Sequence, residues 1–125
     1  MKFTYTGIEV RDMDRSIKFY TVALGMKLEG RGPVPDTKGE AAGLRSPGSK
    51  QILELNWYPR RRYRAGSELD HLGFDVGDGD VETEIERLVT LGATRFIPTE
   101  VRPKYVVGFV KDPDGVCIEL YKARK

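Results

Sequence analysis

Apolar and polar positions alternate one by one over residues 3–10. Thr6, Ile8 and Val10 fall on one side of an extended chain, while Tyr5 falls on the other. A period of two predicts a half-buried β-strand. The chain is therefore expected to begin with a strand whose even-numbered residues face the core.

The next apolar side chains, from Met13 to Leu24, recur at helical spacing. Asp12 or Asp14 offers the N-cap oxygen that accepts a hydrogen bond from the first turn, and Gly25 suits the residue that ends a helix. A helix is therefore predicted directly after the first strand.

The remaining segments complete two similar series of elements. After the helix, the first half contains predicted strands at 26–30, 40–45 and 51–57, separated by turn-rich stretches. The second half contains a predicted strand at 70–76, a helix at 81–91, and strands at 93–97, 106–111 and 116–122. Both halves therefore have the order β-α-β-β-β.

The two halves also match residue by residue. Residues 5–12 align with 71–78, with Gly, acidic, Val and Asp positions coinciding, and residues 52–55 align with 117–120. A unit of this length that occurs only twice indicates duplication of a supersecondary module rather than a repeat array.

We therefore predict an α+β fold built as a single domain over residues 1–125. Module one spans 1–58, a linker spans 59–68 and module two spans 69–125. The two tandem βαβββ modules are expected to form a curved, mostly antiparallel open sheet with helices on its outer face.

Composition narrows the class of protein. With 125 residues, 39% hydrophobic and 32% charged, the chain is long enough for one core and is not disordered. A net charge of +2 disfavours nucleic-acid binding.

No apolar run reaches the roughly 18 residues of a membrane span, and no apolar signal segment is evident, so a cytoplasmic location is expected. The single cysteine, Cys117, excludes an internal disulfide and a thiolate metal cage.

Four polar residues take equivalent places in the two modules. Tyr5 and His71 lie in the first strands, and Glu54 and Glu119 lie in the last strands. Their apolar neighbours face the helix layer, so all four project from the opposite face. A single strand glutamate is most simply a solvated carboxylate. Two matched glutamates with the only histidine of the chain form a hard-donor set suited to a divalent metal.

The chain also resembles a known family over nearly its whole length. The segments that carry the resemblance are TGIEV at 6–10, DRSIKFY at 14–20, LGM at 24–26, LDHLGFDV at 69–76 and DPDGVCIEL at 112–120. They resemble the vicinal oxygen chelate superfamily, which includes glyoxalase I, extradiol dioxygenases, methylmalonyl-CoA epimerase, and the fosfomycin and bleomycin resistance proteins. The sequence looks most like glyoxalase I, whose metal ligands are His, Glu, His and Glu in chain order. Those places hold Tyr5, Glu54, His71 and Glu119 here.

Tyr5 departs from this family pattern. A phenol ionises only near about pH 10 in water and is a poor ligand for Zn²⁺ or Ni²⁺. Glu54, His71 and Glu119 still form an open site for one divalent metal (Zn, Ni, Co or Mn), at which Tyr5 could donate a hydrogen bond or a proton. The alternative is that the change abolishes metal binding and leaves a binding cleft.

The resemblance implies a lyase of the lactoylglutathione lyase type, acting on the adduct of a 2-oxoaldehyde and a thiol. Glu119 is expected to remove the carbon-bound proton, the metal to stabilise the enediolate, and Glu54 to return the proton. The alternatives are an extradiol-type dioxygenase, an epimerase with the same enolate chemistry, or a metal-free antibiotic-binding protein. The dioxygenase fits badly, since Tyr5 removes one of its two histidine ligands.

Four flanking residues are candidate substrate contacts. Asn56 follows Glu54 and could line the cleft. Arg60 opens a basic run on the linker that could meet an anionic substrate, although a solvated linker is the simpler interpretation. Lys104 and Tyr105 precede the strand at 106–111, where a mobile substrate loop is expected.

The open edges of the predicted sheet invite pairing, so a homodimer is expected. In glyoxalase-like dimers, the first module of one subunit faces the second module of the other. The resemblance thus implies that one metal could join the two halves of the ligand set across subunits. Pairing of the two modules within one chain is the alternative.

Overall fold

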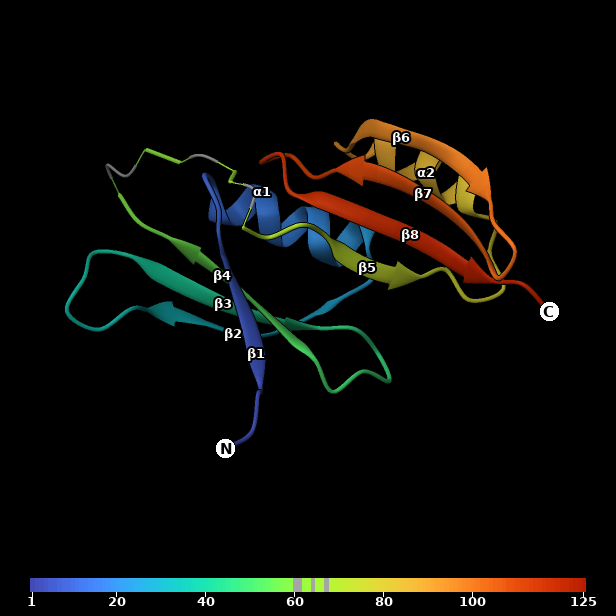
Figure 1. Cartoon of the computed structure of the whole chain (residues 1–125). Helices are drawn as coiled ribbons and strands as arrows, with labels where there is room; N and C mark the ends of the chain where they lie inside the picture. Colours follow the sequence, from blue (N-terminus) through green and yellow to red (C-terminus); the bar gives the residue numbers. More distant parts are fainter. Residues whose placement is uncertain (60–61, 64, 67) are drawn as a thin grey trace. The chain divides into compact units, whose positions relative to one another are not determined.

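The chain folds as two compact units, residues 1–64 and 65–125 (Figure 1). A computed structural model describes residues 1–59, 62–63, 65–66 and 68–125. Each unit has its own four-stranded mixed sheet and one helical segment, in the order strand, helix, strand, strand, strand. The predicted α+β class with two tandem βαβββ modules is confirmed. The boundary between the units lies inside the stretch predicted as a linker.

The sheet of the first unit has the strand order β1-β4-β3-β2. Its elements are β1 (Tyr5–Glu9), α1 (Met13–Lys18), η1 (Phe19–Ala23), β2 (Lys27–Pro33), β3 (Glu40–Arg45) and β4 (Ile52–Trp57). Strands β1 and β4 are parallel, whereas β4 with β3 and β3 with β2 are antiparallel.

The second unit repeats this topology with the order β5-β8-β7-β6. Its elements are β5 (Leu72–Asp75), α2 (Val81–Thr90), β6 (Thr94–Val101), β7 (Tyr105–Lys111) and β8 (Cys117–Ala123). Strands β5 and β8 are parallel and the other two pairs are antiparallel. Helix α2 packs against β6, β7 and β8 (Figure 1).

The apolar alternation places the core as predicted. In the first unit Ile8 of β1 and Leu53 and Leu55 of β4 are buried, whereas Tyr5 is 50% exposed. In the second unit the buried residues of β8 are Ile118 and Leu120. The helices contribute Phe19, Tyr20, Ile85 and Leu88, all of which are buried.

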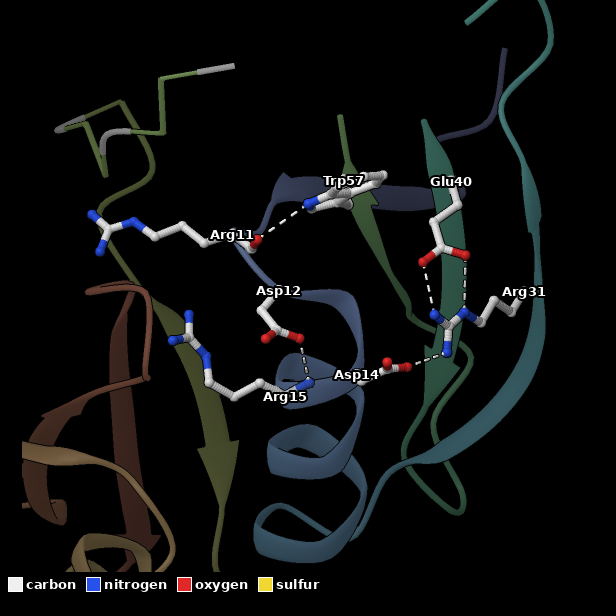
Figure 2. Close-up of polar contacts among 7 residues, drawn as sticks. All are labelled: Arg11, Asp12, Asp14, Arg15, Arg31, Glu40 and Trp57. Carbon is white, nitrogen blue, oxygen red and sulfur yellow. Dashed lines mark hydrogen bonds and ion pairs between the residues drawn. The ribbon is translucent and has the colours of Figure 1, made fainter. Parts of the chain in front are cut away.

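The helix ends follow the predicted signals. Of the two N-cap candidates, Asp12 is the cap, since its Oδ1 accepts from the Arg15 backbone N–H at 2.9 Å (Figure 2). Asp80 caps α2 through Thr83 in the same way, also at 2.9 Å. Gly25 and Gly92, with φ of +70° and +112°, follow the helical segments and supply the left-handed backbone that other residues adopt at a cost.

The spacing predicted one regular α-helix for the first helical segment, but the structure differs. After Lys18 the segment continues as the π-helix η1. The Thr21 hydroxyl donates to the Ile17 carbonyl at 2.7 Å, an interaction that competes with regular backbone bonding. The local side-chain bond thus accompanies a wider turn that the apolar spacing could not reveal.

In each module an arginine from the second strand binds the second residue of the helix. Arg31 of β2 binds Asp14 at 2.6 Å and donates two further hydrogen bonds to Glu40 of β3, at 2.7 and 3.0 Å (Figure 2). Arg95 of β6 binds Glu82 at 2.5 Å. The Arg95 guanidinium, followed by the Thr99 hydroxyl, holds the pKa of Glu82 below its usual value. These pairs attach each helix start to its own sheet.

Some strand boundaries differ from the predictions. Strands β2 and β6 extend to Pro33 and Val101, beyond the expected ends at 30 and 97. Both are edge strands with irregular register, where Gly and Pro are tolerated because one side of the backbone needs no partner. Strand β5 is shorter than expected, so His71 lies directly before it.

Candidate functional site

The parallel strand pairs give the two modules the same register. Gly7 of β1 stands beside Glu54 of β4, and Gly73 of β5 stands beside Glu119 of β8. Tyr5 and His71 each lie two residues before the glycine of their own module. The equivalence of Glu54 and Glu119 is therefore present in the backbone pairing, whereas Tyr5 is paired within β1 and His71 lies just before β5.

In the second module His71 and Glu119 come together. His71 Nε2 lies 3.4 Å from Glu119 Oε2, and the two side chains are 37% and 24% exposed. The imidazole also packs edge-on against the ring of Phe109, whose centroid is 5.9 Å away. Phe109 is the cross-strand neighbour of Glu119 on β7. A nitrogen and a carboxylate oxygen are thus held side by side at a partly open position.

This spacing suits a shared divalent ion. Nitrogen and oxygen ligands lie about 2.0–2.2 Å from Zn²⁺, so two of them at tetrahedral angles are about 3.3–3.6 Å apart. The 3.4 Å between His71 Nε2 and Glu119 Oε2 falls in that range. Among the described residues, however, no three His, Cys, Asp or Glu side chains gather into a metal-binding group. Two residues of the predicted set of four therefore lie side by side, and their role as metal ligands stays a prediction.

The first module carries the other two predicted ligands. Tyr5 is half-exposed at the start of β1, and Glu54 is half-buried in β4. A Cβ added at Gly7 would lie 3.2 Å from Asn56 Nδ2 and 4.0 Å from Glu54 Oε1. The glycine therefore leaves room for these two polar side chains on the face opposite the core.

A pocket of about 430 Å³ opens beside Glu119 in the second unit. Its lining residues are Arg102, Tyr105, Val107, Glu119 and Tyr121. Tyr105 and Tyr121 meet edge to face with ring centroids 6.3 Å apart. The carboxylate thus shares a cavity with an aromatic wall and a guanidinium group.

Arg102 was not among the predicted site residues. It follows the edge strand β6, outside every motif, and its Nη2 also pairs with Glu100 Oε2 at 3.1 Å. The available sequence signal was its place just before the strand that carries Tyr105. That signal is weak because the turn between β6 and β7 also contains another cation, Lys104.

The other candidate substrate contacts have different outcomes. Asn56 lies beside Gly7, as described above, and Lys104 lies between β6 and β7, where its carbonyl accepts from the Arg124 N–H at 2.9 Å. Tyr105 was expected in a mobile loop, but it is the first residue of β7 and pairs with Ala123. Its backbone is held by the sheet, because the β7–β8 ladder extends one residue further than the apolar pattern indicated. Arg60 lies outside the described residues.

Cys117 shares a strand with Glu119 but is not poised to react. Partial burial raises the pKa of its thiol, with smaller contributions from Asp70 and Glu119, against the opposing effect of Lys111. The thiolate is therefore disfavoured.

Comparison with known proteins agrees with this architecture. The chain matches the model of the Glyoxalase/Bleomycin resistance protein/Dioxygenase superfamily over residues 2–120. The chain therefore belongs to this superfamily. No helix in the described part of the chain is long and apolar enough to cross a membrane.

Individual relatives point to one branch of the superfamily. A lactoylglutathione lyase of Salmonella typhimurium is 32% identical over 128 residues, covering 99% of this chain and 94% of that protein. A probable chloroplastic lactoylglutathione lyase of Arabidopsis thaliana is 36% identical over 118 residues, covering 89% of this chain and 33% of the relative. The crystal structure of glyoxalase I from Zea mays superposes with a TM-score of 0.80 at 31% identity, covering 94% of this chain and 43% of that one.

The plant relatives are longer than this chain. It spans a third of the length of the Arabidopsis protein and less than half of the maize structure. The match to the Salmonella protein, in contrast, covers 94% of that protein. The shared unit is therefore the pair of modules.

Proposed function

We propose that this chain is a metal-dependent lyase of the glyoxalase I type, which isomerises adducts of 2-oxoaldehydes and thiols. The observation that carries the proposal is the His71–Glu119 pair, whose donor atoms lie 3.4 Å apart beside a pocket of about 430 Å³. The similarity to a Salmonella protein named lactoylglutathione lyase, which covers 94% of that protein, supports the substrate class.

The donor chemistry suits one divalent ion, with Zn, Ni, Co and Mn as candidates. His71 and Glu119 would hold it from the second module, and Glu54 with Tyr5 would complete the set. When bound, such an ion supplies Lewis acidity toward the substrate oxygens.

Glu119 is the proposed general base. Its carboxylate is partly shielded and lines the pocket, so it can reach a carbon-bound proton of a ligand there. Glu54, at the equivalent register position of the first module, is the proposed group that returns the proton one carbon over. The Tyr5 hydroxyl would donate a hydrogen bond to the oxygen that gains charge.

Arg102, Tyr105 and Asn56 are the proposed substrate contacts among the described residues. The guanidinium suits an anionic group on the thiol part of the adduct, and the tyrosine ring suits an apolar part. Lys104 adds positive charge to the same turn.

We further propose a cytoplasmic homodimer. Strands β1 and β2 lie at the edges of the first sheet, and β5 and β6 lie at the edges of the second. Edge strands present backbone groups that can pair with another chain. The single free cysteine suits a reducing compartment.

The experiment combines metal analysis with an activity assay. The protein is purified without chelators and loaded separately with Zn²⁺, Ni²⁺, Co²⁺ and Mn²⁺. Each form is then incubated with methylglyoxal and glutathione, and the thioester product is followed by NMR. We expect bound metal and turnover, with Glu119→Gln slower by about 10²- to 10⁴-fold, as for other general bases.

Glu86→Gln is the matched control, because Glu86 is an exposed carboxylate of α2. It should leave both metal content and turnover unchanged. A metal-loaded wild-type protein without turnover, or a Glu119→Gln variant as active as the control, would contradict the proposal. A small-molecule binding protein without catalysis would then be the better interpretation.

A further inference from the structure

The imidazole of His71 has a second polar partner on the side away from Glu119. Asp70 Oδ1 lies 2.6 Å from His71 Nδ1. Asp70 is otherwise highly exposed, with 93% of its side chain accessible. A side chain with so much freedom is nonetheless directed onto one nitrogen of the proposed ligand.

We propose that Asp70 is a positioning residue that fixes the neutral His71 ring as the Nδ1–H tautomer and so leaves the Nε2 lone pair free for the metal. An ionised carboxylate can only accept hydrogen bonds, so the 2.6 Å contact favours the tautomer with the proton on Nδ1. In a neutral imidazole the other nitrogen is then an acceptor. That nitrogen, Nε2, is the one that faces Glu119.

The ring is restrained on more than one side. Asp70 contacts Nδ1, and Phe109 stands perpendicular to the imidazole at an interplanar angle of 90°. Rotation of the His71 imidazole about its Cβ–Cγ bond would break the short contact between Nδ1 and Asp70. Carboxylates that accept from the distal nitrogen of a metal-binding histidine orient the ring and raise its basicity, and removing them typically lowers metal affinity by about 10- to 100-fold.

The first module offers an internal comparison. By the same alignment, Thr4 and Tyr5 stand where Asp70 and His71 stand in the second module. The module without the imidazole therefore also lacks the carboxylate beside it. This agrees with Asp70 acting through His71 rather than serving as a general surface charge.

The tautomer can be observed directly, because His71 is the only histidine of the chain. Long-range ¹H–¹⁵N NMR spectra of the metal-free, full-length protein report which ring nitrogen carries the proton, at a pH well above that at which imidazoles ordinarily ionise. We expect Nδ1–H in the wild type and a shift toward Nε2–H in Asp70→Ala. Asp70→Asn replaces the acceptor-only carboxylate with an amide that can also donate to Nδ1, so this variant should shift toward Nε2–H as well.

Glu68→Gln is the charge-matched control. Glu68 is an exposed carboxylate two residues before Asp70, so this variant removes one negative charge close to His71 in sequence. It should leave the tautomer unchanged. An Nε2–H tautomer in the wild type, or the same spectrum in wild type and Asp70→Ala, would overturn the inference.

Metal affinity provides the second measurement and depends on the proposed function. In competition with a chromogenic chelator, Co²⁺ should bind about 10- to 100-fold more weakly to Asp70→Ala than to wild type, with Glu68→Gln unaffected. Equal affinity in Asp70→Ala and wild type would overturn the role toward the metal. If the wild type binds no Co²⁺ or Zn²⁺ at all, the proposed function fails, and the NMR result alone decides whether Asp70 positions the ring.

Discussion

The two modules have the same backbone plan but present different chemistry at the same register position. Each places a glutamate of its last strand beside a glycine of its first strand. In module two that glutamate faces an imidazole with a carboxylate behind it, whereas module one has Tyr5 preceded by Thr4. Duplication has thus preserved strand pairing, which many residues determine together, while single side chains have diverged.

Packing between helix and sheet differs as well. Gly108 of β7 pairs with Leu120, and the corresponding position of module one, Ala42, pairs with Leu55. A Cβ at Gly108 would lie 2.6 Å from Ile85 Cδ1 and 3.0 Å from Thr99 Oγ1. Helix α2 therefore approaches its sheet more closely than a side chain at residue 108 would allow.

The largest effect is expected when module two is given the residue of module one. His71→Tyr removes the imidazole, so metal affinity should fall by more than about 100-fold, since even indirect partners contribute about 10- to 100-fold. Chelator competition measures the affinity, and circular dichroism checks that the variant is folded. A folded variant that binds metal as tightly as wild type would show that the two modules are not functionally distinct in this way.

The packing difference predicts the next largest effect. Gly108→Ala should lower the free energy of unfolding by about 1–3 kcal/mol, because Ile85 is buried and cannot move away without disturbing the core. Gly43→Ala is the control, since its Cβ would meet Ile52 Cγ2 at an ordinary 3.8 Å. Urea unfolding of both variants tests the contrast. Equal stability of the two would mean that α2 adjusts freely.

The converse exchange, which gives module one the histidine of module two, should increase metal affinity. Tyr5→His supplies an imidazole at the position where glyoxalase I-like sequences have one, so metal should bind about tenfold more tightly or better. Tyr5→Phe should retain the metal and slow turnover if the hydroxyl donates to the substrate. Metal titration and steady-state kinetics separate these effects. If neither substitution alters metal binding or the rate of turnover, Tyr5 only lines the binding cleft.

The smallest effect concerns the ion pair between Glu82 of α2 and Arg95 of β6 and its contribution to stability at acid pH. The pKa of Glu82 is lowered in the folded protein by Arg95 and then by Thr99, so its stabilising contribution is complete above the ordinary value of 4.5 and is lost as the pH falls through the lowered pKa. Glu82→Gln should therefore flatten the decline in stability between neutral and acid pH. Denaturant midpoints across that range provide the measurement, with Glu68→Gln expected to follow the wild type. An unchanged acid profile in Glu82→Gln would show that the pair with Arg95 does not stabilise the fold.

Much of the fold could be predicted because its signals are local. Apolar alternation located β3 and β4 to within a residue, and the predicted helix at 81–91 agrees with α2 to within a residue. The edge strands β2 and β6 were predicted too short, since glycine and proline resemble turn signals wherever a strand needs no partner on one side. The apolar spacing up to Leu24 predicted a helix after Lys18 but could not distinguish the π-helix η1 from an α-helix.

For the site, the sequence by itself determined which residue types stand at matched positions: Tyr5 against His71, and Glu54 against Glu119. Internal repetition made this visible, because equal spacing in two copies implies equal places in the backbone. Only the tertiary structure decided that His71 Nε2 faces Glu119 at 3.4 Å, that Asp70 engages the other nitrogen, and that Arg102 joins the pocket. These contacts depend on side-chain directions and on strand pairing between distant segments, which spacing along the chain does not encode.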